Sequence, residues 1–281
     1  MDVGNGLPNA VPGVERAGIV DWARSAEEAG FSSLGTIGRI AYPNYEELIS
    51  LAAAAAVTER IRLATDVLLL PLRRNAALFA KQAATLDSLS NGRLVLGLAP
   101  GGREDDYRLS GADFSERNKI FDRMLEGLTD LWEEDEVGPP TAGGGRPRLL
   151  IGGYTEVAFR RAAKYGDGWT QGGATPDALA EASKKLEELW REEGREGSPY
   201  KVALFYFGLG DGAEEQARKE LGDYYAWLGD YAQQIVDSAA KDEGTVKGYL
   251  SAFEQAGADE VICFPASTDP GQVELLAQAI K

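Results

Sequence analysis

The sequence has no histidine, a single cysteine and no apolar run of about 18 residues, the length at which a membrane span is suspected. Without histidine, the chain cannot build a Ser-His-Asp triad, a His-ligated zinc site or an imidazole general base. Cys263 cannot pair within the chain, and its place in the apolar run VICFPA indicates a small buried core residue. Any chemistry must therefore use carboxylates, tyrosine, arginine, backbone amides or a bound cofactor.

Positive charge is scarce, because 29 Lys and Arg residues face 45 Asp and Glu residues and leave a net charge of −16. A chain with this charge repels nucleic acid and anionic membranes, so neither is expected as a partner. The N-terminus lacks a charged segment followed by an apolar one, which favours a cytoplasmic protein over a secreted one. The 281 residues are 44% apolar, and since single β/α barrels commonly have about 250 residues, we expect one domain over residues 1–281.

Apolar runs of strand length alternate along the chain with segments of helical period, separated by Gly, Pro or polar turns. Eight such pairs predict an α/β fold, a parallel eight-stranded TIM (β/α)8 barrel. In this fold the functional residues lie on the loops that follow the strands, at the C-terminal face. The predicted strands are residues 2–7, 32–37, 61–69, 93–99, 148–152, 167–171, 201–208 and 259–264.

Helices are indicated by apolar spacing and by capping residues. Thr175-Pro176 and Asp269-Pro270 each place a capping residue before a proline at the expected first helical position. One apolar stripe recurs at steps of three and four residues, and its members are Phe121, Met124, Leu125, Leu128, Leu131 and Trp132.

Two segments between the predicted strands are longer or less regular than the rest. Residues 213–256 are long for one crossover, so we expect two helices there, with Tyr224, Tyr225 and Trp227 on the first. Residues 134–147 are rich in Gly and Pro and lack a period, which is typical of a surface loop.

The stretch from Arg62 to Tyr107 joins two apolar strands to an amphipathic helix, AKQAATLD, and ends in the strand GRLVLG and a glycine-rich loop. Further on, the chain reads IGGYT and then RAAKYGDGW, ending at Trp169. These segments resemble the luciferase-like monooxygenase superfamily, whose members are flavin- or F420-dependent oxidoreductases. The resemblance starts at Gly6 and becomes weak after about residue 200.

The resemblance implies a TIM barrel that binds FMN or the deazaflavin coenzyme F420 and transfers hydride at the tricyclic ring; the sequence does not distinguish the two cofactors. The implied partners are a small organic substrate, a separate reductase that supplies the reduced cofactor, and a second copy of the chain in a homodimer. Deazaflavin-dependent relatives commonly carry an Asp-His pair after the second strand. Gly38 and Arg39 take those places here, which puts the usual proton transfer in doubt.

The third strand carries Thr65, Asp66 and Val67. The resemblance implies a β-bulge near Asp66-Val67, often with a non-prolyl cis peptide, behind the central ring of the cofactor. Asp66 lies in an otherwise apolar strand, and a buried carboxylate needs a partner. Asp66 is therefore a candidate for the site, and a structural hydrogen bond to a neighbouring loop is the alternative.

The fourth strand leaves through a loop that begins Pro100, Gly101, Gly102 and Arg103. The glycines let backbone amides approach a ring or a phosphate, and Arg103, Glu104 and Tyr107 could reach substrate or cofactor. Adjacent acidic residues at a helix start are typical of a solvated turn, so Glu104-Asp105-Asp106 is not interpreted as a magnesium site and no metal is expected. The catalytic candidates are Arg39, Asp66, Glu104 and Tyr107, with a solvated rim residue as the alternative for Arg39.

The fifth and sixth strands end in glycine-rich turns before helices, an arrangement that presents N–H donors and a partial positive charge to a phosphate. Ordinary helix-capping turns would explain either loop separately. Trp169, Tyr206, Phe207 and Phe264 near strand ends are interpreted as core rather than as walls of a ligand site. The candidate cofactor-binding residues are Gly38, Thr65, Asp66, Val67, Pro100, Gly101, Gly102, Arg103, Gly152, Gly153, Tyr154, Gln171, Gly172 and Gly173.

Two other functions remain open. A flavin-binding barrel without catalysis would explain the changes at Gly38 and Arg39. A phosphate-substrate barrel enzyme, such as an isomerase or aldolase, would use the same late glycine loops. No lysine lies at a predicted strand exit to form a Schiff base, which argues against the aldolase.

Overall fold

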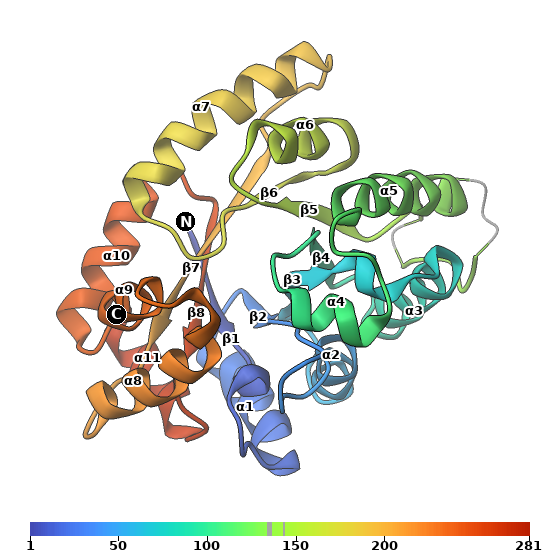
Figure 1. Ribbon diagram of the computed structural model, residues 1–281. Coiled ribbons are helices and arrows are strands. Elements are labelled where there is room, and N and C mark those ends of the chain that lie inside the picture. Colours follow the sequence, from blue (N-terminus) through green and yellow to red (C-terminus); the bar gives the residue numbers. More distant parts are fainter. Residues whose placement is uncertain (134–136, 143) are drawn as a thin grey trace.

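Eight parallel strands form a closed barrel in the order β1 to β8, and the computed structural model describes residues 1–133, 137–142 and 144–281 (Figure 1). The TIM-barrel prediction is confirmed, and each predicted strand boundary lies within one residue of the observed one. The strands are β1 (Asp2–Gly6), β2 (Ser33–Thr36), β3 (Arg62–Leu69), β4 (Leu94–Ala99), β5 (Arg148–Gly152), β6 (Gly168–Thr170), β7 (Tyr200–Phe207) and β8 (Glu260–Pro265).

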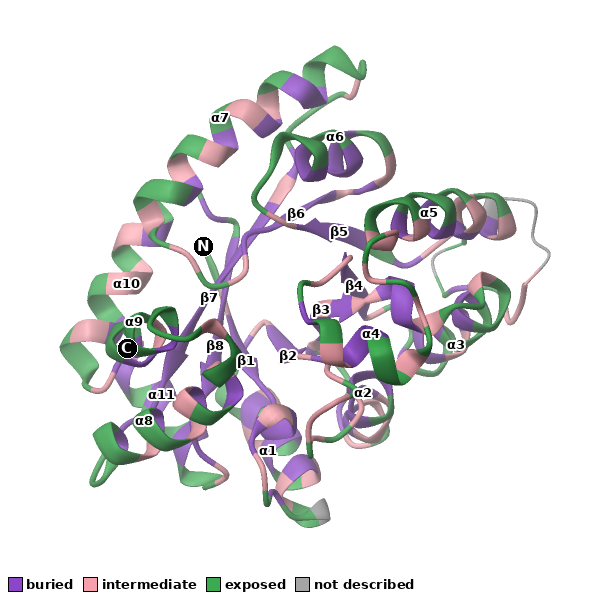
Figure 2. Ribbon diagram, viewed as in Figure 1, coloured by how far each residue is buried: buried purple, intermediate pink, exposed green. Residues whose placement is uncertain are grey.

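The helices surround the barrel with a buried face toward the strands and an exposed face outward (Figure 2). Phe121, Leu125 and Leu128 of the predicted apolar stripe are fully buried. The α-helices are α1 (Arg16–Ala29), α2 (Glu47–Ala55), α3 (Ala76–Leu89), α4 (Glu104–Ser110), α5 (Arg117–Glu133), α6 (Glu156–Tyr165), α7 (Pro176–Glu192), α8 (Ala213–Tyr224), α9 (Tyr231–Ser238), α10 (Glu243–Gln255) and α11 (Gly271–Ala279), with short 3-10 helices η1 (Pro8–Ala10), η2 (Leu70–Arg73) and η3 (Ala226–Leu228).

The β7–β8 connection differs from the prediction, because three α-helices and η3 replace the two helices expected. Tyr224 ends α8, Tyr225 follows it, and Trp227 lies on η3 rather than on the same helix. Gly229 ends η3 with φ 59° and ψ −132°, a backbone conformation that glycine adopts without steric cost. This glycine separates the aromatic segment from α9.

The predicted helix starts are only partly as expected. Thr175 caps α7, with its hydroxyl accepting from the amide of Ala178 at 3.2 Å. Pro270, however, precedes α11, which begins at Gly271. In the predicted loop 134–147, residues 137–142 and 144–147 form no helix or strand, and residues 134–136 and 143 lie outside the described residues.

A polar cluster closes the amino end of the barrel interior. The buried Glu260 carboxylate accepts hydrogen bonds from Ser33 at 2.7 Å and from Tyr200 at 3.1 Å, and it pairs with Arg62 at 3.0 Å. Above this cluster the interior is apolar, with Val95, Leu150, Val202, Leu204, Ile262 and Phe264 among its members. Cys263 is buried and free, as predicted. Trp169, Tyr206, Phe207 and Phe264 are buried core residues, as expected.

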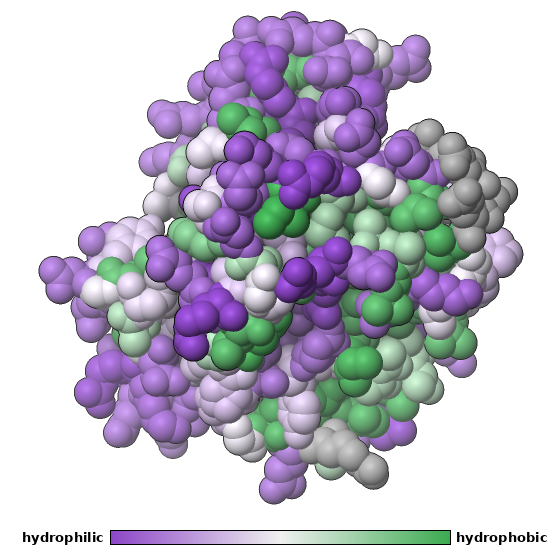
Figure 3. Space-filling view, turned by 45° about the vertical axis from the view of Figure 1, so that its right-hand side comes forward, coloured by the Kyte–Doolittle hydropathy of each residue, from purple (hydrophilic) through white to green (hydrophobic). Residues whose placement is uncertain are grey.

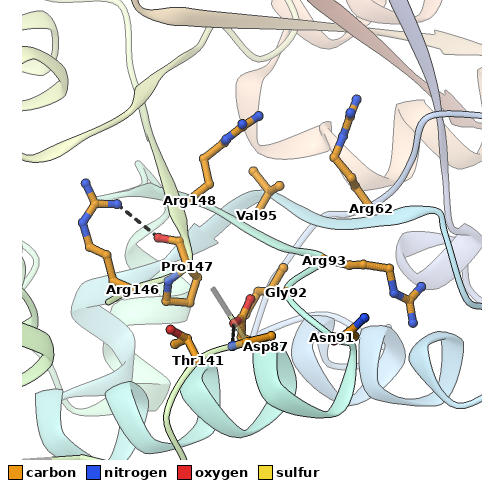
Figure 4. A pocket seen from close by; sticks show the side chains of 12 residues that line it. Arg62, Asp87, Asn91, Gly92, Arg93, Val95, Thr141, Arg146, Pro147 and Arg148 are labelled. Carbon is orange, nitrogen blue, oxygen red and sulfur yellow. Dashed lines mark hydrogen bonds between the residues drawn. The ribbon is translucent and has the colours of Figure 1, made fainter. Parts of the chain in front are cut away.

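A cleft of about 430 Å³ lies outside the amino ends of β3, β4 and β5, on the face opposite the strand exits (Figure 4). In that view Arg62 and Arg148 extend on one side, and Arg93 turns away from them. Arg146 pairs with Asp167, and Arg93 donates to backbone carbonyls. Most of these cations therefore already have partners, and the cleft is not the candidate site.

The molecular surface is mixed in polarity. Figure 3 shows apolar residues among a largely hydrophilic surface, and the exposed apolar side chains include Ile40, Ile49, Leu78 and Leu109. None of the helices in the described part of the chain has the length and apolar character to span a membrane.

Candidate active site

The third strand is irregular where it reaches the C-terminal mouth of the barrel. Its register with β4 shifts between Thr65 and Leu68, and the peptide bond between Asp66 and Val67 is cis. Both features were expected from the resemblance and are confirmed. Val67 is half-buried, and a Cβ on Gly152 of β5 would lie 3.0 Å from its Cγ1. Val67 and Gly152 thus form one apolar ledge at the mouth.

The side chain of Asp66 points into the barrel and is 5% exposed. Its Oδ1 accepts a hydrogen bond of 2.5 Å from the hydroxyl of Thr170 on β6, whereas Oδ2 is buried without a partner among the described residues. Burial raises the pKa of the Asp66 carboxyl from its ordinary 3.8 to about 7, although the Thr170 hydrogen bond lowers it. A carboxyl with this pKa can donate or accept a proton at neutral pH.

Glycines at inward positions make room for the contact between β3 and β6. Strands β4 and β5 lie between them and contribute Gly97 and Gly152, the latter paired in register with Thr170. A Cβ on Gly97 would lie 2.2 Å from the carbonyl oxygen of Thr65, whose hydroxyl donates to the Gly97 carbonyl at 2.9 Å. Thr65 is therefore buried in the wall of the barrel.

The loops after β5 and β6 present free backbone donors at the mouth. Among the described residues, no acceptor lies within hydrogen-bond distance of the amides of Gly153, Tyr154 and Gly173. Gly153 has φ 135° and Gly172 has φ 67°, and the indole of Trp169 donates to the Gly153 carbonyl at 2.7 Å. Such amides, close to the start of α6, can bind an anion.

Two side chains flank these loops. Tyr154 is 61% exposed, and its hydroxyl lies 2.9 Å from the position that a Cβ on Gly172 would take. Gln171 is buried, and its Nε2 donates to the carbonyl of Thr175 at 3.2 Å. Its Oε1 is a second buried oxygen without a partner in the described part of the chain.

The loop after β4 does not bring all of its candidates to the mouth. Tyr107 was expected to reach a ligand, but it is buried, packs edge-on against Phe114 and donates its hydroxyl to the Pro100 carbonyl. The expectation was wrong because this hydroxyl is already used inside the loop. Glu104 is exposed at the start of α4. Gly101 has φ 75°, which favours glycine there.

Arg39 is not a solvated rim residue. Its side chain is 6% exposed and pairs with Asp105 at 2.6 Å and with Asp106 at 3.3 Å. Asp106 is fully buried and also accepts from the amides of Ile40 and Ala41, so the expected solvated acidic turn is wrong at this position. These contacts make Arg39 an anchor between the β2 and β4 loops.

Gly38, expected at the cofactor, is buried against α2 instead. A Cβ on Gly38 would lie 2.4 Å from Oε1 of Glu47, which pairs with Arg73. Glycine is needed here because the carboxylate occupies the space that a side chain would take.

An aromatic roof, formed by Tyr224, Tyr225 and Trp227, covers the mouth from the β7–β8 connection. The guanidinium carbon of Arg103 lies 4.5, 5.5 and 4.9 Å from their ring centroids, respectively. The hydroxyl of Tyr225 lies 2.5 Å from that of Tyr206 on β7. Sequence analysis assigned these aromatic residues to a helix and missed the roof, and it also missed Thr170. The only signal for Thr170 was its position beside Gln171 at a strand exit.

Residues 3–260 match the family model described as luciferase-like monooxygenase. The chain belongs to the luciferase-like monooxygenase family. This family of flavin- and F420-dependent oxidoreductases is the one that the sequence resembled. An uncharacterized protein of Mycobacterium tuberculosis (strain ATCC 25618 / H37Rv) is 36% identical over 214 residues, which cover 64% of this chain and 73% of the relative.

Solved structures share the barrel at low sequence identity. An F420-dependent secondary alcohol dehydrogenase, in complex with an F420-acetone adduct, superposes with a TM-score of 0.80 at 18% identity and covers 100% of this chain and 99% of its own. Riboflavin lyase, with modified FMN and riboflavin, gives a TM-score of 0.72 at 16% identity and covers 100% of this chain and 90% of its own. At these identities the likeness establishes the fold alone.

Proposed function

We propose that the protein is an oxidoreductase that uses FMN or F420 to transfer hydride between the cofactor ring and a small organic substrate. Family membership supports the reaction class. The observation that carries the proposal is the bulge at the mouth, where Val67 offers an apolar ledge and Asp66 offers an unpartnered oxygen in the same place. Among neighbours of the same fold, one binds F420 and another FMN, so both cofactors are retained.

The residues at the mouth fit a flavin-type cofactor. A planar ring would rest on Val67 and Gly152, and the free amides of Gly153 and Gly173 would bind its phosphate. When bound, the cofactor supplies the hydride chemistry. The protein binds and orients the ring, and the aromatic roof excludes water from it.

Asp66 would exchange the proton that accompanies hydride transfer. When hydride adds to a carbonyl carbon, the carbonyl oxygen must gain one proton, and protonated Asp66 can donate it from Oδ2. In the reverse direction the ionised carboxylate accepts the alcohol proton. Thr170 holds the carboxyl through Oδ1 in both directions. No histidine is available for this role.

A second candidate is a flavin-binding barrel without catalysis. It is favoured by Arg39, which occupies a position where deazaflavin-dependent relatives commonly carry proton-transferring residues and is here held in an ion pair. Turnover with reduced cofactor distinguishes the two candidates, because a protein that only binds the cofactor shows none.

The test is an absorption titration with FMN and, separately, with F420, followed by single-turnover measurements on wild type and Asp66→Asn. We expect one cofactor to bind, and the variant to retain affinity while its rate falls at least tenfold. Asp87→Asn is the matched control, since Asp87 is also buried with a raised pKa but lies at the opposite end of the barrel. If neither cofactor binds, the proposed function is wrong.

A separate reductase would supply the reduced cofactor, and a homodimer is the assembly that the resemblance implies. Both stay proposals. Sedimentation of the purified chain tests the dimer, and turnover with chemically reduced cofactor, compared with turnover in the presence of a flavin reductase, tests the reductase.

A further inference from the structure

Arg103 is a buried cation without an acidic partner. It is 9% exposed, and among the described residues no carboxylate lies within 4.0 Å of its nitrogens. Its one hydrogen bond runs from Nη1 to the carbonyl of Tyr224 at 2.9 Å. Burial lowers the pKa of the guanidinium, yet arginine stays charged at neutral pH.

Two comparably buried arginines of the same chain are paired. The side chain of Arg39 is 6% exposed and contacts two carboxylates, and that of Arg161 is 8% exposed and contacts Asp122 at 2.5 Å. The chain has 45 acidic residues, so acidic groups are abundant. A buried charge that is left unpaired costs free energy, and Arg103 therefore stands apart.

The contacts of Arg103 leave one edge of its guanidinium open. The aromatic roof stacks on the cation, and the Tyr224 carbonyl takes Nη1. Nε and Nη2, which lie side by side along the other edge, have no hydrogen-bond acceptor among the described residues, and neither atom is completely enclosed. Two parallel N–H groups of this kind match the two oxygens of a carboxylate or phosphate.

The position of Arg103 is also that of a ligand contact. It follows β4 at the C-terminal face, where barrel enzymes bind their ligands, and the Tyr225 that it stacks on also bonds Tyr206 above the barrel interior. A purely structural cation would not need an open edge at this face.

We propose that Arg103 binds an oxyanion, a carboxylate or phosphate, of a ligand at the barrel mouth through its Nε–Nη2 edge. The oxyanion belongs either to the substrate, which is then an anionic compound, or to the phosphate-bearing side chain of the cofactor. The inference rests on the proposed function only for the identity of the ligand, because the chemistry of the open edge is independent of the cofactor.

The experiment compares wild type with Arg103→Gln, Arg103→Lys and the control Arg148→Gln. Arg148 is exposed at the opposite end of the barrel and stacks over Tyr200 at 4.9 Å, so its variant removes the same charge and a similar contact. In the first arm, inorganic phosphate is the probe: melting temperature is measured in sodium phosphate and in sodium chloride at equal ionic strength. In the second arm, the Kd values of FMN and riboflavin are measured.

We expect phosphate to raise the melting temperature of wild type and of Arg148→Gln above the chloride value. Arg103→Gln should bind phosphate at least tenfold more weakly, about 1.4 kcal/mol. Arg103→Lys keeps a cation under the roof but not the planar edge, so it should fold and still lose most of the phosphate response. If the ratio of riboflavin to FMN Kd values also falls in Arg103→Gln, the oxyanion is the cofactor's; if that ratio is unchanged, it is the substrate's.

The proposal is overturned if phosphate acts no differently from chloride on wild type, or if both Arg103 variants respond to phosphate as wild type does. It is equally overturned if Arg148→Gln loses as much of the response as Arg103→Gln, because the effect would then be one of net charge. Failure of the proposed function has a separate signature. Neither FMN, riboflavin nor F420 would bind, whereas the phosphate response would still depend on Arg103.

Discussion

Replacing Asp66 by asparagine should make the protein more stable at neutral and alkaline pH. Asparagine keeps the oxygen that accepts from Thr170 but cannot ionise. The wild-type carboxyl is buried, and its pKa is raised from 3.8 to about 7. The folded protein therefore holds a proton between about pH 4 and pH 7 that the unfolded chain has already released.

The sign and size of the effect follow from this difference in proton binding. Because the folded state binds the extra proton, the stability that Asp66 contributes is complete below about pH 4 and is lost as pH rises to about 7. At 1.36 kcal/mol per pKa unit, the loss is on the order of 4 kcal/mol. The variant lacks this term, so its free energy of unfolding should exceed that of wild type by an amount that grows with pH and then becomes constant.

Urea unfolding of wild type and Asp66→Asn at several pH values between 4 and 8 measures this difference. Other carboxylates titrate in both proteins, so their contributions cancel. Any constant cost of the amide, such as an unpaired N–H in place of Oδ2, shifts the difference curve without changing its slope. A difference that does not vary with pH would refute the raised pKa and, with it, the proton-exchange role proposed for Asp66.

Three further outcomes are expected. Arg39→Ala should lower the free energy of unfolding by about 3 kcal/mol, because it leaves the buried Asp106 without its cation, whereas activity per folded molecule should be unchanged; a loss below about 0.5 kcal/mol in thermal unfolding would show that the ion pair is unimportant. Thr170→Val removes a hydrogen bond that lowers the pKa of Asp66, so the corresponding transition in the pH–rate profile should move to higher pH, and an unmoved profile would disconnect the two residues. Gly153→Ala should destabilise the fold by about 1–3 kcal/mol in denaturant unfolding, since φ is 135° there, and normal stability would contradict this strain.

The barrel itself could be predicted from the sequence because strand and helix periods are local. All eight strands were placed within one residue, since each is an apolar run bounded by turn residues. The bulge at Asp66-Val67 was predicted from the family resemblance rather than from the residues alone. The unpartnered Oδ2 of Asp66 was not predictable, because the spacing of the sequence does not reveal which groups surround a buried side chain.

Long-range partners account for the errors at the site. Arg39 meets Asp106, which is 67 residues away, and Arg103 meets the carbonyl of Tyr224, which is 121 residues away. The acidic turn before Tyr107 has the composition of a solvated helix start, and only the arrival of the β2 loop buries it. Contacts of this kind depend on how the loops of different strands meet at the mouth.

The hydrogen bond between Asp66 and Thr170 acts as a bar across the lumen of the barrel. Its two oxygens are 2.5 Å apart, and no ligand atom can pass between them without breaking it. A cofactor ring must therefore stop above the bar, with the substrate on its far side or beside it, and the proton must come from below. The Glu260 cluster at the amino end is thus sealed from the chemistry, so substitutions there should alter the stability of the barrel and leave the depth at which ligands bind unchanged.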